Sequence, residues 1–350
     1  MQKHIPNKMD TVLNIKNELL LAPIYLYYIF IIFMLYIIVI VSSWLLFAGV
    51  DIIPQRLYEK RAHSKLNSYY NEIELKNWFV GFVDGDGSFS VLQGKNGYWS
   101  LVFKVGQSPY NLRALYTIKK LLGVGKVYIE GHNAHFVIRD RKLITSIILP
   151  IFDEFPLLTS KAFYYTIFRE ACLILNNTLL TQTEKSRLIQ ELKSKDIPND
   201  YISYAWSTVS NNVLDAHLVM SKSWLAGFTE AEGSFYIVAK SANRMVHAFG
   251  ITQKLDLIVL NAIRLILGVD TVVRIKKTHF SLDITNSKDI FIVRDFYKDI
   301  LISMKGVEYK IWSRSLNYKG DFEKLNTARN QYRYIKSLRA TINLFEAFKK

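Results

Sequence analysis

Two stretches of the chain carry paired acids at matching places. Asp84 and Asp86 flank a glycine, and Glu230 and Glu232 flank an alanine. Gly-Ser-Phe follows each pair, and a constant offset of 146 residues relates the two stretches. If the stretches lie side by side, Asp86 and Glu232 are neighbouring like charges, which is costly unless a cation sits between them. Hard carboxylate oxygens suit Mg²⁺, so the pattern predicts a divalent metal site built from both stretches.

Short apolar helices are predicted to position these acids. The segments Lys76–Asp84 and Lys222–Glu230 are apolar along one side, and a glycine then breaks each helix before a strand begins. Gly81 and Gly227 occupy the third place of matching apolar runs. Because glycine lacks a Cβ, two such helices can cross with their backbones close together.

A calcium loop of the EF-hand type is the obvious alternative for the stretch that begins at Asp84. Such a loop needs glycine at its sixth place and glutamate at its twelfth. Counted from Asp84, these places hold Phe89 and Lys95, which excludes the EF-hand. The other alternative, two helix ends with unrelated acids, leaves the duplication unexplained.

The duplicated pattern resembles the LAGLIDADG homing endonuclease and maturase family. Phe79–Gly87 and Leu225–Gly233 align with the nine-residue motif of that family without gaps. The resemblance covers about residues 70–320. It implies an α+β fold of two αββαββα halves with saddle-shaped antiparallel sheets. It also implies a monomer with pseudo-two-fold symmetry.

The same resemblance implies a metal-ligand set. Asp86 and Glu232 would be the direct ligands of Mg²⁺ or Mn²⁺, and the carbonyls of Gly85 and Ala231 would assist them. Metal ions held between two halves can polarise phosphate and activate water at both DNA strands. Glutamate in place of the second aspartate is a departure from the family pattern that keeps the charge. The other two motif acids are expected to serve the helix ends.

Glutamines and lysines at matching places add four candidate catalytic residues. Gln107 and Gln253 each follow the motif acid by 21 residues, at the end of a predicted strand. In the family, a polar residue here helps hold the water around the metals, whereas a simple strand-end cap is the alternative. Lys161 and Lys305 each precede a tyrosine by four residues. The resemblance places them near the scissile phosphate, where they stabilise developing charge; a solvated lysine at a helix start is the alternative.

Alternating strand residues are predicted to form a DNA-reading surface. Every second side chain of a strand leaves the core, a β-ribbon fits the major groove, and basic side chains contact phosphates. For any single candidate, a solvated strand face is an equal alternative. The candidates are Ser90, Lys104, Lys126, Tyr128, Arg139, Tyr236, Lys240, Arg274, Lys276 and His279.

Composition favours a polyanionic partner. Among 350 residues, 45 Lys and Arg face 30 Asp and Glu, which gives a net charge of +15 and suits nucleic acid. Cys172 is the only cysteine, which excludes a disulfide framework and a cysteine-based zinc site. The bias toward Ile, Asn, Lys, Tyr and Phe is typical of an A+T-rich organellar genome.

The first 65 residues are predicted to be a leader that contains a membrane span. Residues 19–50 carry no charge, and about 20 apolar residues suffice to cross a bilayer. Positive charge flanks both sides of the span, so its orientation stays open. In intron-encoded relatives, such a leader resembles the translated end of an upstream exon.

Four segments follow the leader. They are a first half at 66–182, a linker at 183–220, a second half at 221–320 and a basic C-terminal helix at 321–350. Each half is expected to run helix, two strands, helix, two strands, helix. The helix Arg141–Phe152 is expected to stop at Pro150 and Pro156, and Thr183–Lys195 is expected to be a charged helix of the linker.

These observations predict a site-specific, divalent-metal-dependent endonuclease that cuts double-stranded DNA in intron homing. The predicted location is the mitochondrion, at the inner membrane where the leader is retained. A second prediction, from another class, is an RNA-binding maturase that helps splice its host group I intron through the basic C-terminal helix. A third is a membrane protein that carries a decayed nuclease domain.

Overall fold

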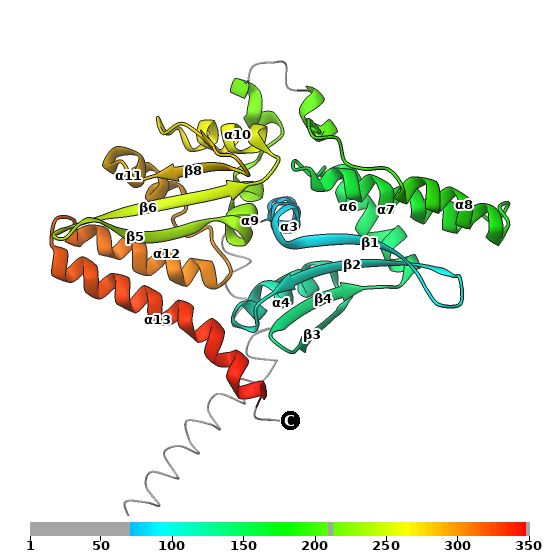
Figure 1. The fold of residues 1–350 in the computed structure, drawn as a ribbon, viewed down its shortest axis with the longest axis horizontal. Coiled ribbons are helices and arrows are strands. Elements are labelled where there is room, and N and C mark those ends of the chain that lie inside the picture. Colours follow the sequence, from blue (N-terminus) through cyan, green and yellow to red (C-terminus); the bar gives the residue numbers. More distant parts are fainter. Residues whose placement is uncertain (1–70, 209–212, 348–350) are drawn as a thin grey trace, which may run out of the picture. The chain divides into compact units, whose positions relative to one another are not determined.

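The computed structural model describes residues 71–208 and 213–347. This part of the chain forms two antiparallel four-stranded sheets with helices, in the predicted α+β order (Figure 1). The predicted membrane span at residues 19–50 lies outside the described residues. Within the described ranges, none of the helices combines the length and apolar character that a bilayer span requires.

The first half contains the sheet order β1-β2-β4-β3. A 3₁₀ turn, η1 at Pro109–Asn111, leads into the helix that joins the two hairpins, and this helix ends at the left-handed Gly123. The elements are α3 Glu72–Asp86, β1 Gly87–Gln93, β2 Trp99–Gln107, α4 Leu112–Leu122, β3 Lys126–Glu130, β4 Asn133–Ile138, α5 Arg141–Leu143, η2 Ile144–Ile148, α6 Leu149–Glu154 and α7 Lys161–Asn176.

The second half repeats this arrangement with the sheet order β5-β6-β8-β7. Its third strand is short, since only Arg274–Ile275 pair with the neighbouring strand. The elements are α9 Lys222–Glu232, β5 Ser234–Ser241, β6 Arg244–Gln253, α10 Leu257–Leu267, β7 Arg274–Ile275, β8 Phe280–Ile284, α11 Ser287–Phe296, α12 Met304–Ser315 and α13 Phe322–Ala347.

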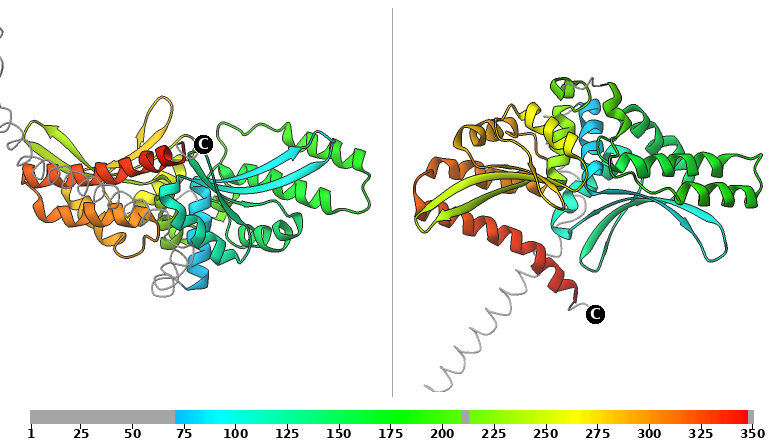
Figure 2. Two further views of the ribbon diagram at one scale, coloured as in Figure 1. Left: turned by 90° about the horizontal axis from the view of Figure 1, so that it is seen from below. Right: turned by 45° about the horizontal axis from the view of Figure 1, so that its top comes forward.

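Helices α3 and α9 cross between the two sheets with their backbones in contact (Figure 2). A Cβ added to Gly81 would lie 2.0 Å from the carbonyl oxygen of Trp224. A Cβ added to Gly227 would lie 1.9 Å from the carbonyl oxygen of Trp78. Both distances are far below van der Waals contact, so only glycine fits at either place. The predicted close crossing is confirmed.

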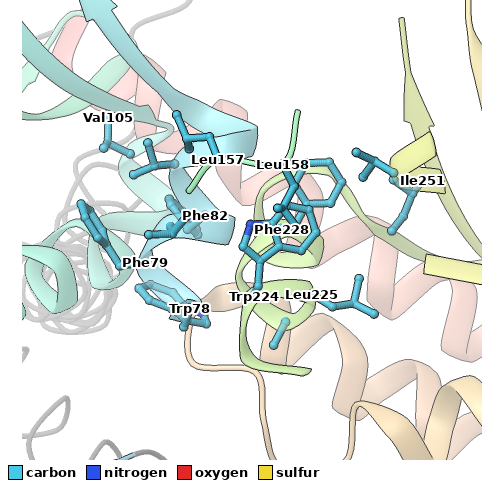
Figure 3. Close-up of a cluster of buried hydrophobic side chains, with 14 of the residues drawn as sticks. Trp78, Phe79, Phe82, Val105, Leu157, Leu158, Trp224, Leu225, Phe228 and Ile251 are labelled. Carbon is cyan, nitrogen blue, oxygen red and sulfur yellow. The ribbon is translucent and has the colours of Figure 1, made fainter. Parts of the chain in front are cut away.

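Aromatic side chains fill the seam between the halves. Trp78 stacks on Phe82 with ring centroids 5.2 Å apart, and Trp224 stacks on Phe228 at 4.8 Å. All four are buried and belong to one apolar cluster (Figure 3). The seam is therefore part of the hydrophobic core, and the two halves of the described chain form one packed unit.

In each sheet, the aromatic side chains of one face pack against helices. Phe89 and Phe103 on the first sheet pack against Phe152 of α6. Phe235 on the second sheet packs against Trp312 of α12 and Tyr297. Because strand side chains alternate between faces, the residues between these aromatics point to the opposite face.

Pro150 does not stop its helix, contrary to the prediction. The helical path continues from Arg141 to Glu154 through the π turn η2, in which the Leu149 N–H donates to the Ile144 carbonyl. Proline cannot donate a backbone hydrogen bond and crowds the preceding turn, and the wider π turn lies directly before it. The second predicted stop is correct, because the helix ends at Glu154, before Pro156.

The first part of the segment between the halves packs on the first half. Helix α8, Gln182–Lys193, follows the predicted charged helix closely. It contacts α7 and buries Ile189 and Leu192, and the Trp99 indole donates to Ser186 Oγ at 3.1 Å. Its apolar face is narrow but sufficient to hold it against the core.

Candidate active site

The two motif acids meet at the ends of the crossing helices. Asp86 and Glu232 are the last residues of α3 and α9, two residues beyond the predicted helix ends. A Cβ on Gly85 would lie 2.3 Å from the Ala231 Cβ and 3.1 Å from the Glu232 Cγ. The turns that carry the acids are therefore in direct contact across the seam.

Burial and mutual repulsion make this pair costly to ionise. Burial and the Glu232 charge raise the pKa of Asp86 to about 6, against the influence of Lys161 and Lys305. Glu232 reaches solvent with its side chain, but its partly buried surroundings raise its pKa as well. The same two lysines lower it. Two carboxylates and two ammonium groups thus converge on one place.

Both predicted glutamines contact these acids. The Gln107 amide donates to Asp86 Oδ2, and the Gln253 side chain forms a hydrogen bond with Glu232. Each bond joins the end of the second strand to the end of the motif helix of the same half. The strand-end cap considered for these residues does not describe them, since the amides contact the acids themselves.

Both predicted lysines are held against the ends of the motif helices. Lys161 Nζ donates to the carbonyls of Val83 at 2.9 Å and Gly85 at 2.6 Å. Lys305 Nζ donates to the carbonyl of Gly233 at 2.7 Å. Burial lowers the pKa of Lys161, while nearby acids, Asp84 first, oppose this shift. A freely solvated lysine at a helix start is therefore the wrong description of either residue.

The other two motif acids do not serve their own helix ends as expected. Asp84 accepts hydrogen bonds from the backbone N–H groups of Leu158 at 2.7 Å and Thr159 at 3.2 Å. Glu230 accepts from Ser303 at 2.6 Å and from Ile302. These donors lie just before α7 and α12, the helices whose first turns carry the two lysines. Asp84 and Glu230 therefore fix the positions of the lysine-bearing helices.

Asp84 and Glu230 also join the two halves of the protein. The Trp224 indole donates to Asp84 Oδ2, and the Trp78 indole donates to Glu230 Oε1, each at 3.2 Å. Each bond runs from one motif helix to the buried acid of the other. The repeat carries tryptophan at the same place in both copies, a signal in the sequence that could have predicted this exchange.

The donor set at the seam fits a hard divalent cation. Among the described residues, no three His, Cys, Asp or Glu side chains gather into a metal-binding group. The candidate set is instead two carboxylates, Asp86 and Glu232, beside the helix-end carbonyls of Gly85 and Ala231. Oxygen donors of this kind suit Mg²⁺ and Mn²⁺. A bound cation would also relieve the repulsion that raises the pKa of Asp86.

Four predicted reading residues share one face of the first sheet. Lys104 and Lys126 both stand opposite Val137 in the strand register, and Ser90 and Tyr128 follow on the same alternation. This face, which we call the open face, is opposite to Phe103 and Phe136 of the core. Arg139 lies just after β4.

The second sheet places its candidates less uniformly. In the strand register, Tyr236 and Arg274 share the open face of the second sheet, which is opposite to Phe235 and Phe249 of the core. Lys240 lies at a β-bulge, where the alternation is interrupted. Lys276 and His279 lie in the turn between β7 and β8, joined by a backbone hydrogen bond of 2.9 Å.

Sequence reasoning missed several polar residues at these places. His135 lies between Gly106 and Tyr128 on the open face of the first sheet. Asp283 lies opposite Gly250 on the second, where its charge adds to burial in raising the pKa of Tyr236. Both belong to predicted strands at alternating places, so the strand pattern could have identified them. Asn111, four residues after Gln107, was also missed.

Comparison with known proteins gives a consistent picture. A sequence model described as "LAGLIDADG endonuclease" matches residues 79–172 and 225–316. The chain is 36% identical over 281 residues to "Probable intron-encoded endonuclease Cox1-I1b" of Schizosaccharomyces pombe, covering 76% of this chain and 70% of that protein. It is 24% identical over 289 residues to "Probable intron-encoded endonuclease 3" of Neurospora crassa, covering 75% of this chain and about half, 53%, of that protein.

Solved structures share the fold. The structure "I-SmaMI bound to uncleaved DNA target in the presence of Calcium ions" superposes with a TM-score of 0.61 at 23% identity. The match covers 75% of this chain and 97% of that one. At this identity the likeness concerns the arrangement of helices and sheets.

Proposed function

Because the chain belongs to the LAGLIDADG endonuclease family, we propose that it is a site-specific, divalent-metal-dependent endonuclease that cuts double-stranded DNA in intron homing. One observation carries the proposal. The helices that bear the two motifs cross at Gly81 and Gly227 and deliver Asp86 and Glu232 to one place, beside two buried or half-buried lysines.

The residues around the seam have separable tasks. A divalent cation bound by Asp86 and Glu232 would neutralise phosphate charge and make water a better nucleophile. Gln107 orients the Asp86 carboxylate through its amide. Lys161 and Lys305 supply positive charge near both acids, where charge develops on a phosphate during hydrolysis.

The open faces of the two sheets would hold the DNA. Lys104 and Lys126 on the first sheet and Arg274 on the second suit phosphate or guanine contacts. The relative from Schizosaccharomyces pombe is named as intron-encoded, which supports homing as the process. A mitochondrial location is supported by the A+T-rich bias of the composition. Inner-membrane association depends on the leader, which lies outside the described residues.

Cleavage of a selected target tests the proposal. The full-length chain would select duplexes from a randomised library in Ca²⁺, and Mg²⁺ or Mn²⁺ would then start the reaction. We expect double-strand cuts by the wild type, and binding without cuts by Asp86→Asn and Glu232→Gln. Selection of a target that the wild type never cuts would end the endonuclease proposal.

A role in RNA splicing is a second candidate, favoured by helix α13. This helix packs Leu325, Ala328 and Tyr332 into the protein and leaves Lys324 and Arg333 exposed. Because deleting the helix would remove core residues, charge substitution is the cleaner test. If the chain is a maturase, Lys324→Ala with Arg333→Ala slows splicing of the host intron and leaves DNA cleavage intact; unchanged splicing would argue against this role.

A further inference from the structure

The two candidate centres, one around Asp86 and one around Glu232, are built from similar residues but differ four residues after the glutamine. Each has a glutamine on its acid and a lysine at the start of a helix. Four residues after Gln107 stands Asn111, whereas four residues after Gln253 stands Leu257. Asn111 is buried and polar, whereas Leu257 has an aliphatic side chain that cannot form a hydrogen bond.

Asn111 forms the middle of a directed chain of hydrogen bonds. Its Oδ1 accepts from the backbone N–H of Met304 at 3.1 Å, and its Nδ2 donates to Gln107 Oε1 at 2.8 Å. Gln107 in turn donates to Asp86 Oδ2. A backbone N–H can only donate, so it fixes which way the Asn111 amide points. That orientation requires Gln107 to accept from Asn111 and to present its own NH₂ group to the acid.

This chain crosses from one half of the protein to the other. Met304 is the first residue of α12, and its N–H is one of the groups that a helix start leaves without an internal partner. The next residue is Lys305, whose Nζ lies at the end of α9. Asn111 therefore connects the Asp86 carboxylate to the helix start that carries the lysine of the opposite half.

Beside the Glu232 centre, a different kind of residue accepts the hydrogen bond from the start of the opposite half's helix, α7. The N–H of Ser160, which matches Met304, donates to Asp256 Oδ1 at 2.6 Å, and the Ser160 hydroxyl donates to Asp256 Oδ2 at 3.0 Å. Both carboxylate oxygens of Asp256 are thus engaged by one serine. The residue after Asp256, Leu257, has no polar side-chain atom with which to orient Gln253. The link between the helix start and the glutamine is built at Asn111 in the first half only.

Building on the proposed function, we propose that Asn111 is a positioning residue of the Asp86 centre that has no counterpart in the Glu232 centre, so that the two DNA strands are cut by unequal centres. Asn111 holds the Gln107 amide in the orientation that donates to the acid. Without it, the amide is free to rotate and presents its oxygen to a carboxylate for part of the time. The Asp86 carboxylate is then less well oriented, and one strand is cut more slowly.

Strand-resolved single-turnover cleavage by the full-length chain tests this. A selected target duplex carries a different dye on each strand, and Mg²⁺ starts the reaction. For Asn111→Leu, which copies the residue of the second half, we expect one strand to be cut at least tenfold more slowly and the other less than twofold. Nicked duplex then accumulates. Equal slowing of both strands, or no slowing of either, would overturn the proposal.

A second variant covers the case in which Asn111→Leu fails to fold. Asn111→Asp keeps the acceptor for Met304 but cannot donate to Gln107, so it should slow the same strand. Binding of the target in Ca²⁺ reports whether either variant is folded. Retained strand balance in a folded Asn111→Asp would overturn the proposal. A wild type that binds but cuts neither strand would instead refute the proposed function, so the two failures are distinguishable.

Discussion

Within each motif, the two acids lie two residues apart and have different surroundings. With 3.6 residues per helical turn, such residues point to roughly opposite sides. Asp84 faces the core and accepts hydrogen bonds from backbone, hydroxyl and indole donors. Asp86 faces the seam, where it meets Glu232. One short motif thus supplies a structural acid and a candidate metal ligand.

This division predicts opposite effects of the same substitution. Asp84→Asn places an amide NH₂ group among donors, including Trp224 and Thr159, and leaves buried groups unsatisfied. We expect it to lower the free energy of unfolding by about 3 kcal/mol. Asp86→Asn removes a desolvated charge beside Glu232 and should leave that free energy unchanged or raise it. Urea denaturation at pH 7 measures both; equal losses in the two variants would contradict this division.

The raised pKa of Asp86 predicts how the need for metal depends on pH. Burial and Glu232 raise this pKa to about 6 without metal, so a proton competes with the cation below that pH. We expect the Mg²⁺ concentration for half-maximal cleavage to rise as the pH falls through 6, by about tenfold per pH unit for one displaced proton. Above pH 7 it should be constant. Saturating Mg²⁺ should restore much of the rate at pH 5.5, and an equal Mg²⁺ requirement at pH 5.5 and 7.5 would refute this prediction.

At the scale of elements, the crossing of α3 and α9 sets the geometry of the site. The two backbones touch at the glycines, which lie five residues before the acids. The indoles of Trp78 and Trp224 then tie each helix to the buried acid of the other. Any change that separates these helices must also separate Asp86 from Glu232.

Adding one methyl group to this crossing is therefore expected to be severe. In Gly81→Ala the new Cβ would lie 2.0 Å from the Trp224 carbonyl oxygen, which cannot move without its helix. We expect a loss of about 3 kcal/mol or more in the free energy of unfolding, measured by urea denaturation, because overpacking a rigid contact is costly. Gly106→Ala is the matched control: its nearest neighbour is His135 Nδ1 at 3.7 Å, so the loss should stay below about 1 kcal/mol. Similar losses would show that the crossing tolerates separation.

At the scale of the whole molecule, the duplicated motif was enough to predict the arrangement. The offset of 146 residues paired the acids, the glycines and the glutamines correctly, because each half repeats the same local contacts. Contacts that differ between the halves were not predictable in this way. Asn111 and Asp256 cap helices of the opposite half from non-equivalent places. The continuation of the helix past Pro150 depends on a π turn that no residue pattern predicted.

The net charge of +15 makes a prediction about the whole protein on DNA. Each lysine that neutralises a phosphate releases counterions, so the logarithm of the binding constant falls with the logarithm of salt concentration. Lys104 and Lys126 flank Val137 on the open face of the first sheet. If both contact phosphates, Lys104→Ala with Lys126→Ala should lower the magnitude of that slope by about 2, without changing the preferred target. Lys142→Ala, on the exposed side of α5 in the helical layer, should leave the slope unchanged. Fluorescence anisotropy in Ca²⁺ at several salt concentrations measures the slope, and an unchanged value for the double variant would place the DNA elsewhere.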